Sequence, residues 1–380
     1  MCSTCFSLSR LNPKILCALA VSLVTGSYAQ TGPTNIYGAP FILVATNSSG
    51  IELFGLTSDA QGRVYAGNNS NGDPGIPVQR FDPASFTGVP VALQDFGPAC
   101  PDADGITFGN GLVFVADMGA GVLAVAASGT SSVFLPGVAE NATGSPLAYR
   151  PADGHIFVGL GGLTGILRID EYSNTGAFVR SHATGTDVET MTFDEQSGLI
   201  YYAAFGSAIR ALDPNTDEDR LTANVDGTID GALAFDPISQ RLFVGTANGS
   251  NPGFVETVEV STGTVSPFAS GFSQALGVLR EPVSGNLYFL EYNKLYMLSK
   301  TNVNQAIPPI GLAISLSNSV ARTTWQVVSG NSYQLQFTPR LVPATWTNAG
   351  PILTAVLNRL DLLDTSATNS PRFYRAVLLP

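Results

Sequence analysis

Four acidic residues stand at equivalent places along this 380-residue sequence, each close to the start of an apolar segment. They are Glu52, Asp104, Glu189 and Asp230. Carboxylates that are brought together repel one another, so either their pKa values rise or a hard cation neutralises them. Because no His or Cys accompanies them, oxygen ligands would favour Ca²⁺ or Mg²⁺ over zinc or copper. We therefore predict a divalent-cation site if the fold brings these residues together.

A structural explanation competes with the cation-site hypothesis. Acidic residues before a strand often hold only the backbone of a turn, and Asp-Gly, found at 104–105 and 230–231, is a common turn pair. The segment from Asp102 to Gly105 lacks the later ligands and the distal Glu of an EF-hand loop, so that calcium motif is excluded. The two explanations stay open at the level of sequence.

Other catalytic schemes find little support in the sequence. His155 and His182 are the only histidines, and His155 lies in an apolar segment where we expect a structural role. Neither a Gly-x-Ser-x-Gly nor a His-Glu-x-x-His motif occurs, which excludes the usual serine hydrolases and zinc proteases. Cys100 has no basic neighbour in sequence that would lower its pKa, so we expect an inert thiol.

Six repeats of one plan must position the four acids. Each repeat has an apolar segment, a turn centred on Gly or Asp, and a second apolar segment. The last turn residues recur every 42 to 49 positions, at Gly62, Gly111, Gly154, Gly198, Gln240 and Gly285. A period of about 40 to 50 residues built from short strands is typical of propeller blades.

Two further alternating segments complete each repeat, as in Ile209–Pro214, so we expect four antiparallel strands per blade. Such blades cannot bury their faces alone, and the ring must therefore close. We expect Ile36–Ala45 to pair into the sixth blade after Met297 and to latch the ring. A free N-terminal strand packed on a blade edge is the alternative.

The first 29 residues have the features of a signal peptide. Arg10 and Lys14 precede an apolar run, Ile15–Val24, that is too short to span a bilayer, and small residues lead to Ala29. We expect an exported protein that is extracellular, periplasmic or associated with the cell envelope, and not transmembrane. Without the leader the chain has 16 basic and 29 acidic residues, a net charge of −13 that argues against nucleic acid as a partner.

The chain changes character after Gln305. Residues 306–380 carry five Arg and two Asp, with no Lys or Glu, giving a side-chain charge of +3. We expect Trp325 and Trp346 to lie in a core. Alternating segments predict a small β-sandwich with strands at 313–316, 323–328, 332–337, 355–360 and 373–378.

This C-terminal stretch resembles the short fibronectin type III-like modules that end many large secreted proteins of environmental bacteria. Three segments carry the resemblance, namely Tyr333–Gln336, Thr345–Asn348 and Arg372–Arg375. The resemblance implies an accessory or anchoring module behind the propeller.

The six repeats resemble two groups of propellers. Ile209–Pro214 and Phe235–Gly245 are similar to segments of the NHL and YVTN-type binding propellers. The second group is the senescence-marker-protein/gluconolactonase family, which holds one divalent cation with acidic or amide residues from its first, fourth and fifth blades. The matching positions here are Glu52, Glu189 and Asp230.

That second resemblance also implies lactone hydrolysis, but the sequence departs from the family pattern. The family has an Arg-x-Asn-Asp-Gly segment in its third blade that helps to hold substrate, whereas Gly144–Pro146 stands at that place here. Glu52 likewise lacks the family's Glu-Gly-Pro-x-Trp setting. These departures favour binding over hydrolysis.

The sequence therefore predicts an all-β protein with a signal peptide (1–29), a six-bladed β-propeller (30–305) and a small β-sandwich (306–380). We expect a binding or scaffold module whose channel mouth holds Ca²⁺ or another divalent cation and a small polar ligand. A metal-dependent lactonase-like hydrolase is the enzymatic alternative, with no catalytic residue assigned. A scaffold or adhesion protein with a protein or glycan partner is the third.

Overall fold

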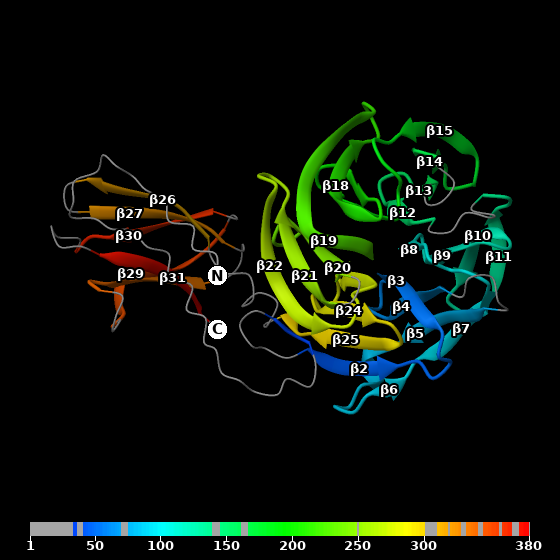
Figure 1. Ribbon diagram of the computed structural model, residues 1–380, viewed down its shortest axis with the longest axis horizontal. Coiled ribbons are helices and arrows are strands. Elements are labelled where there is room, and N and C mark those ends of the chain that lie inside the picture. Colours follow the sequence, from blue (N-terminus) through cyan, green and yellow to red (C-terminus); the bar gives the residue numbers. More distant parts are fainter. Residues whose placement is uncertain are drawn as a thin grey trace. The chain divides into compact units, whose positions relative to one another are not determined.

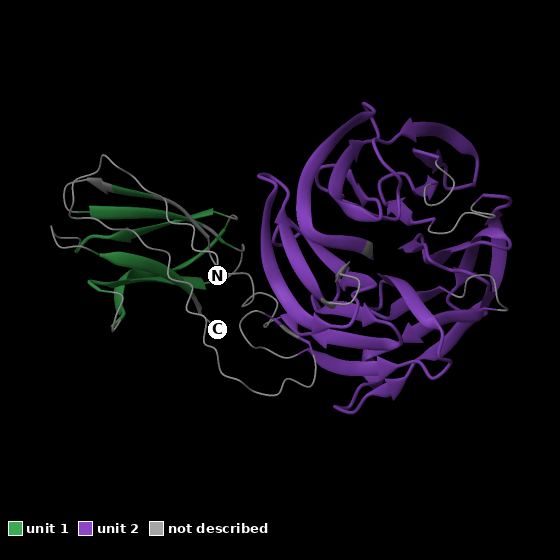
Figure 2. Ribbon diagram, viewed as in Figure 1, with its two compact units in different colours: residues 1–29, 304–380 green, residues 30–303 purple. Residues whose placement is uncertain are grey.

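A computed structural model describes residues 33–35, 41–69, 75–138, 145–160, 166–248, 251–300, 310–317, 320–327, 332–340, 345–356, 359–366 and 372–379. The predicted signal peptide lies outside these residues. The chain divides into two compact units, one formed by residues 30–303 and one that contains residues 304–380 (Figure 2). Strands dominate both units, and the described part has one short 3₁₀ helix, η1 (Pro83–Ser85). Within it, no helix is long and apolar enough to cross a membrane.

The unit formed by residues 30–303 is a six-bladed β-propeller, as predicted (Figure 1). Blade 1 contains β3 (Glu52–Ser58), β4 (Val64–Asn69), β5 (Ile76–Phe81) and β7 (Gln94–Cys100). Blade 2 contains β8 (Ile106–Gly109), β9 (Leu112–Asp117), β10 (Gly121–Ala126) and β11 (Ser131–Leu135). Blade 3 contains β12 (Leu147–Arg150), β13 (His155–Leu160), β14 (Arg168–Tyr172) and β15 (Phe178–Ala183).

The remaining blades follow the same antiparallel order. Blade 4 contains β16 (Thr190–Phe193), β17 (Ile200–Ala203), β18 (Gly206–Asp213) and the first part of β19 (Glu218–Asp236). Blade 5 contains the last part of β19, then β20 (Arg241–Asn248), β21 (Asn251–Glu259) and β22 (Thr264–Phe272). Blade 6 contains β23 (Gly277–Arg280), β24 (Leu287–Glu291), β25 (Lys294–Leu298) and β2 (Ile42–Thr46). The inner strands contact one another in the closed order β3, β8, β12, β16, β19, β23 and back to β3.

Strand β19 joins two blades without a loop, which the repeat pattern does not predict. Its residues from Glu218 to Asn224 pair with β18, and those from Leu233 to Asp236 pair with β20. Blades 4 and 5 therefore form one continuous sheet, seen as the long curved green ribbon in Figure 1.

The N-terminal strand closes the ring as expected. Ile42 lies opposite Met297 and Thr46 opposite Lys294, so β2 is the fourth strand of blade 6. The first part of the predicted latch, residues 36–40, lies outside the described residues. Two short strands add to the outer edges of the last two blades. Strand β1 (Thr34–Asn35) pairs with β22 of blade 5, and β6 (Val91–Ala92) runs parallel to β2 of blade 6.

Aromatic pairs fill several interfaces between neighbouring blades. A ring near the end of one inner strand stacks on a ring from the second strand of the preceding blade, with centroids 5.9 to 6.5 Å apart. The pairs are Tyr149 on Phe114, Phe193 on Phe157 and Phe235 on Tyr201. In blade 6 the aligned residue is Arg280, which is buried, with Nε 3.7 Å from Asp236 Oδ1. A buried cation thus interrupts the aromatic series.

Carboxylates hold the turns of the inner hairpins. Their side-chain oxygens accept hydrogen bonds from backbone N–H groups that lie two to four residues further along the chain. The carboxylates are those of Asp59, Asp194, Asp236 and Glu281. The last turn residue of each hairpin has a positive φ, which glycine adopts most readily. Gln240 is the exception among the six, with φ 56° and a side chain.

The unit that contains residues 304–380 is a β-sandwich of two three-stranded sheets. One sheet has the order β26 (Ile310–Ser317), β27 (Val320–Gln326) and β30 (Arg359–Asp364). The other has the order β29 (Thr347–Thr354), β28 (Ser332–Thr338) and β31 (Phe373–Leu379). Trp325 is buried between them, and its Nε1 donates to Thr323 Oγ1 at 2.8 Å.

Two predictions about this unit are wrong. The strand expected at 355–360 does not form with these bounds: β29 ends at Thr354, Ala355 and Val356 lie outside any strand, and β30 begins at Arg359. Residues 357–358 lie outside the described residues. Buried Ala355 and exposed Val356 continue the alternation beyond β29, and no Gly or Pro marks its end. Trp346, expected in the core, is half-exposed and stacks under Arg375, whose guanidinium carbon lies 4.3 Å from the ring centroid. The Arg375 side chain therefore covers the indole, which does not pack into the core of the sandwich.

Candidate functional site

A small cavity lies at the end of the channel where the inner strands begin. Asp104 precedes β8 of blade 2 and Glu189 precedes β16 of blade 4, and both side chains line this cavity. The described lining is otherwise one hydroxyl side chain, Thr190, with apolar residues and glycines. Two acidic residues that lie 85 positions apart in sequence thus line one small space, whose accessible wall is mostly polar.

Close packing between blades fixes the backbone beside each acid. A Cβ on Gly105 would lie 1.9 Å from Ser145 O, so the residue after Asp104 must be glycine for blades 2 and 3 to meet. On the other side, Glu189 N donates to Ala203 O at 2.8 Å. Thr190 Oγ1 then donates to the carbonyl oxygen of Gly231 at 3.1 Å, which ties blade 4 to blade 5.

An aromatic side chain reaches across this part of the channel. The register of β3 shifts between Phe54 and Leu56 at Gly55, which has φ +63°. From this bulge the Phe54 ring extends to blade 5, where a Cβ on Gly231 would lie 2.1 Å from Phe54 Cζ. Phe54 and Gly231 both line the cavity, so an aromatic ring forms part of its wall.

The four predicted metal ligands have different outcomes. Asp104 and Glu189 line one cavity. Glu52 is the first residue of β3 and is not among the residues that line it, and its Oε2 lies 3.4 Å from Asn69 Nδ2. The Asp230 side chain lies outside what the structure describes, although the next residue, Gly231, lines the cavity. The structure therefore brings two of the four carboxylates together.

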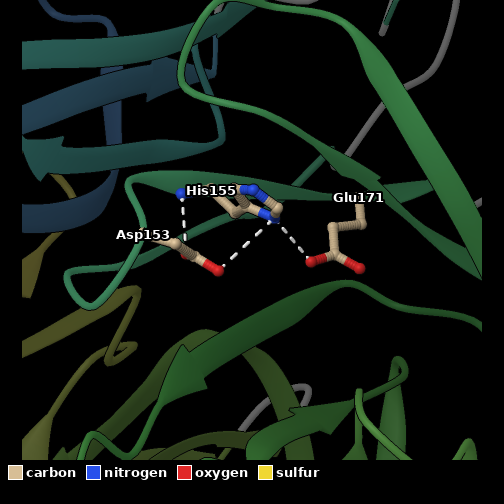
Figure 3. Close-up of side chains that lie close together, drawn as sticks. All are labelled: Asp153, His155 and Glu171. Carbon is tan, nitrogen blue, oxygen red and sulfur yellow. Dashed lines mark hydrogen bonds and ion pairs between the residues drawn. The ribbon is translucent and has the colours of Figure 1, made fainter.

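A second cluster of charged side chains, the Glu171 network, was not predicted. It lies in blade 3 and at its boundary with blade 4, and it contains both histidines of the chain. Its members are Arg150, Asp153, His155, Glu171, Arg180, His182 and Asp217. Figure 3 shows three of them, with the His155 ring between the carboxylates of Asp153 and Glu171.

Glu171 is the centre of this network. Its side chain is only 2% exposed, and four groups surround its two oxygens. Arg150 Nη2 and His155 Nδ1 lie 2.5 and 2.7 Å from Oε1. Arg180 Nε and His182 Nε2 lie 3.1 and 3.2 Å from Oε2. Burial alone would raise the pKa of Glu171, but the hydrogen bonds from His155 and Arg180 and the charge of Arg150 outweigh it and lower the pKa to about 2.

The network also joins two blades. His182 is fully buried on β15, and its Nδ1 lies 2.5 Å from Oδ1 of Asp217 in the β18–β19 turn of blade 4. Arg180 donates to the carbonyl oxygen of Pro214 in the same turn. Because both oxygens of Glu171 already accept from cationic or N–H groups, a metal ion at Asp153, His155 and Glu171 would have to displace Arg150. We therefore assign this cluster a structural role, which agrees with the role expected for His155.

Cys100 does not add a reactive group. The thiol is buried, and this burial raises its pKa to about 12, so it stays protonated at neutral pH. The inert thiol expected from the sequence fits this environment.

Comparisons with known proteins support the fold. No protein-family model and no curated protein matches the chain. Among solved structures it is similar to a gluconolactonase from Xanthomonas campestris, with 14% identity and a TM-score of 0.52 over 68% of this chain and 88% of that chain. It is also similar to the hydrazine synthase of Kuenenia stuttgartiensis, with 10% identity and a TM-score of 0.51 over 67% of this chain and 97% of that chain. At these identities the likeness shows the propeller fold alone.

Proposed function

We propose that the chain is an exported binding propeller whose channel mouth holds a divalent cation through Asp104 and Glu189. One observation carries the proposal: side chains from blades 2 and 4 line the same cavity. Carboxylate oxygens are the ligands that Ca²⁺ and Mg²⁺ prefer. A cation there would draw its remaining oxygen ligands from water, from a bound polar molecule or from Asp230.

The wall of the cavity indicates what else would bind. The two acids and Thr190 lie beside the Phe54 ring and other apolar residues, and the accessible wall is mostly polar, so the site offers charge and hydrogen-bonding groups with some apolar contact. Small-molecule sites combine these features, with a few polar groups that fix orientation. A small polar ligand that reaches the cation with its oxygens fits this combination.

Calorimetry with Ca²⁺ on the chain without its leader tests the cation site. We expect binding in the parent and a loss of at least about tenfold in affinity, or about 1.4 kcal/mol, in Asp104→Asn and Glu189→Gln. Asp153→Asn, in the Glu171 network, is the matched control because it removes one carboxylate elsewhere. A parent protein that takes up no Ca²⁺ at millimolar concentration refutes the proposal.

A metal-dependent lactone hydrolase is the second candidate. The similar propeller from Xanthomonas campestris is a gluconolactonase, and Glu189 stands where the resembling family places a metal ligand. We expect lactone hydrolysis only if the cation polarises a carbonyl. Rates on a panel of sugar lactones, with Ca²⁺, Mg²⁺ or EDTA, decide between the candidates. If the parent protein hydrolyses every lactone of the panel no faster than Glu189→Gln does, the hydrolase is refuted and the binding module remains.

A further inference from the structure

A polar row crosses the outer face of the sheet β29–β28–β31 in the C-terminal unit. The strand register places Gln336 opposite both Asn348 and Arg375. Gln336 Nε2 donates to Asn348 Oδ1 at 2.8 Å, while Nε and Nη2 of Arg375 donate to Gln336 Oε1 at 2.9 and 2.8 Å. The half-exposed Trp346 stacks on the same guanidinium. Three planar groups and an indole therefore form one ordered surface.

Arg375 has no carboxylate partner among the described residues, unlike Arg322 and Arg372 of the same unit. The two Asp residues of 306–380 are occupied, since Asp361 pairs with Arg322 and Asp364 with Arg372. Among the residues that the structure describes, no carboxylate forms a salt bridge with Arg375. Two of its five N–H groups are used by Gln336, so three remain for another acceptor.

We propose that this face binds the carboxylates of an acidic polysaccharide. A guanidinium that is held flat by an aromatic ring and a glutamine presents a fork that matches a carboxylate. The indole offers an apolar body for the C–H face of a sugar ring, and the amides of Gln336 and Asn348 exchange hydrogen bonds with hydroxyl groups. The +3 charge of residues 306–380 draws a polyanion to this unit.

Binding of the full chain, without its leader, to alginate tests this proposal. Dextran serves as the uncharged polysaccharide. The titrations are done in EDTA, so that a cation at the channel mouth does not contribute and the two proposals fail separately. We expect binding to alginate and not to dextran, with weakening on added salt because exposed charges are screened.

Two variants should weaken the affinity for alginate by about ten- to a hundredfold, which is the contribution of a hydrogen bond to a charged group. Arg375→Gln deletes the fork. Gln336→Glu keeps the arginine but supplies it with a carboxylate of its own, so the ligand must compete. Arg340→Gln is the control, because it removes one exposed positive charge from the same unit without touching the row.

Three results would overturn the proposal. The first is no preference for alginate over dextran. The second is equal weakening by Arg340→Gln and Arg375→Gln, which would mean a diffuse charge effect. The third is a dimer in sedimentation that Arg375→Gln dissolves, since the face would then be a contact between copies of the chain. Thermal melts of each variant show that the fold is retained.

Discussion

Acidic side chains gather in two regions of the propeller, at the channel mouth and in the Glu171 network. In the network, Arg150, Arg180 and both histidines surround one buried carboxylate, and the charges balance within the protein. At the channel mouth, Asp104 and Glu189 face a cavity whose other described lining is apolar, hydroxyl or glycine. The first arrangement stabilises an interface between blades, and the second suits a ligand that brings positive charge. Similar residue types thus serve different ends according to their neighbours.

The largest effect that separates the two regions should come from Glu171→Gln. The change leaves Arg150 and Arg180 without their buried partner, and breaking a buried ion pair in this way costs about 3 to 5 kcal/mol of unfolding free energy. Urea unfolding measures the loss. Glu218→Gln, an exposed change in blade 4, is the control and should alter stability little. If Glu171→Gln unfolds at the parent's urea concentration, the network has no structural role.

The pH dependence of stability sharpens the same contrast. The pKa of Glu171 is about 2 in the folded chain against an ordinary value of 4.5. A depressed pKa stabilises the fold above about pH 4.5, and this contribution, about 3 kcal/mol, is lost as the pH falls from 4.5 to 2. Denaturant melts across this range should show a steeper acid loss for the parent than for Glu171→Gln. Parallel profiles for the two proteins would contradict the assignment.

In contrast to Glu171→Gln, Glu189→Gln should affect Ca²⁺ binding and leave stability nearly unchanged. We expect the unfolding free energy without Ca²⁺ to stay within about 1 kcal/mol of the parent, as the removed charge lines a cavity and is not part of the Glu171 network. The stabilisation that Ca²⁺ adds to the parent should be lost. Thermal melts with and without Ca²⁺ measure both quantities. A large loss of stability without Ca²⁺ would show that Glu189 is itself a structural acid.

Asp153→Asn should have the smallest effect. Its side chain is 40% exposed at the rim of the Glu171 network, where it pairs with Arg150. Exposed pairs contribute about 0 to 1 kcal/mol, so we expect a small loss in urea unfolding and unchanged Ca²⁺ binding. Changed Ca²⁺ binding in this variant would mean that the cation binds at the Glu171 network and not at the channel mouth.

Local patterns made the propeller predictable. Hairpin turns recur at a nearly fixed period, four of the six with both a carboxylate and a glycine, and the turns of blades 1 and 3 to 6 are closed by backbone bonds that lie within four residues. The fusion of blades 4 and 5 was missed because β19 contains the pairs Asp226-Gly227 and Asp230-Gly231, which are typical of turns and not of a continuous strand. In the sandwich, the end of β29 at Thr354 was missed because buried Ala355 and exposed Val356 continue the alternation beyond it.

The candidate site was only partly predictable. The repeat alignment places Asp104 and Glu189 just before inner strands, and ring closure brings both to one cavity. Ring closure alone was not sufficient for Glu52, because in β3 it is Phe54 to Leu56, around the bulge at Gly55, that line the cavity. The Glu171 network depends on contacts such as His182 with Asp217, which lie 35 positions apart on the outer parts of two blades. No period in the sequence marks such contacts. The presence of both histidines within one repeat was the available signal.

The position of Phe54 has a consequence for any molecule that binds at the channel mouth. Its ring extends from blade 1 to the backbone of Gly231 in blade 5, where there is no room for even a methyl group. Phe54, Asp104 and Glu189 line the same cavity, so a molecule that binds beside the two acids also meets this ring. A change at position 54 would therefore alter the space for such a molecule without altering its charged partners.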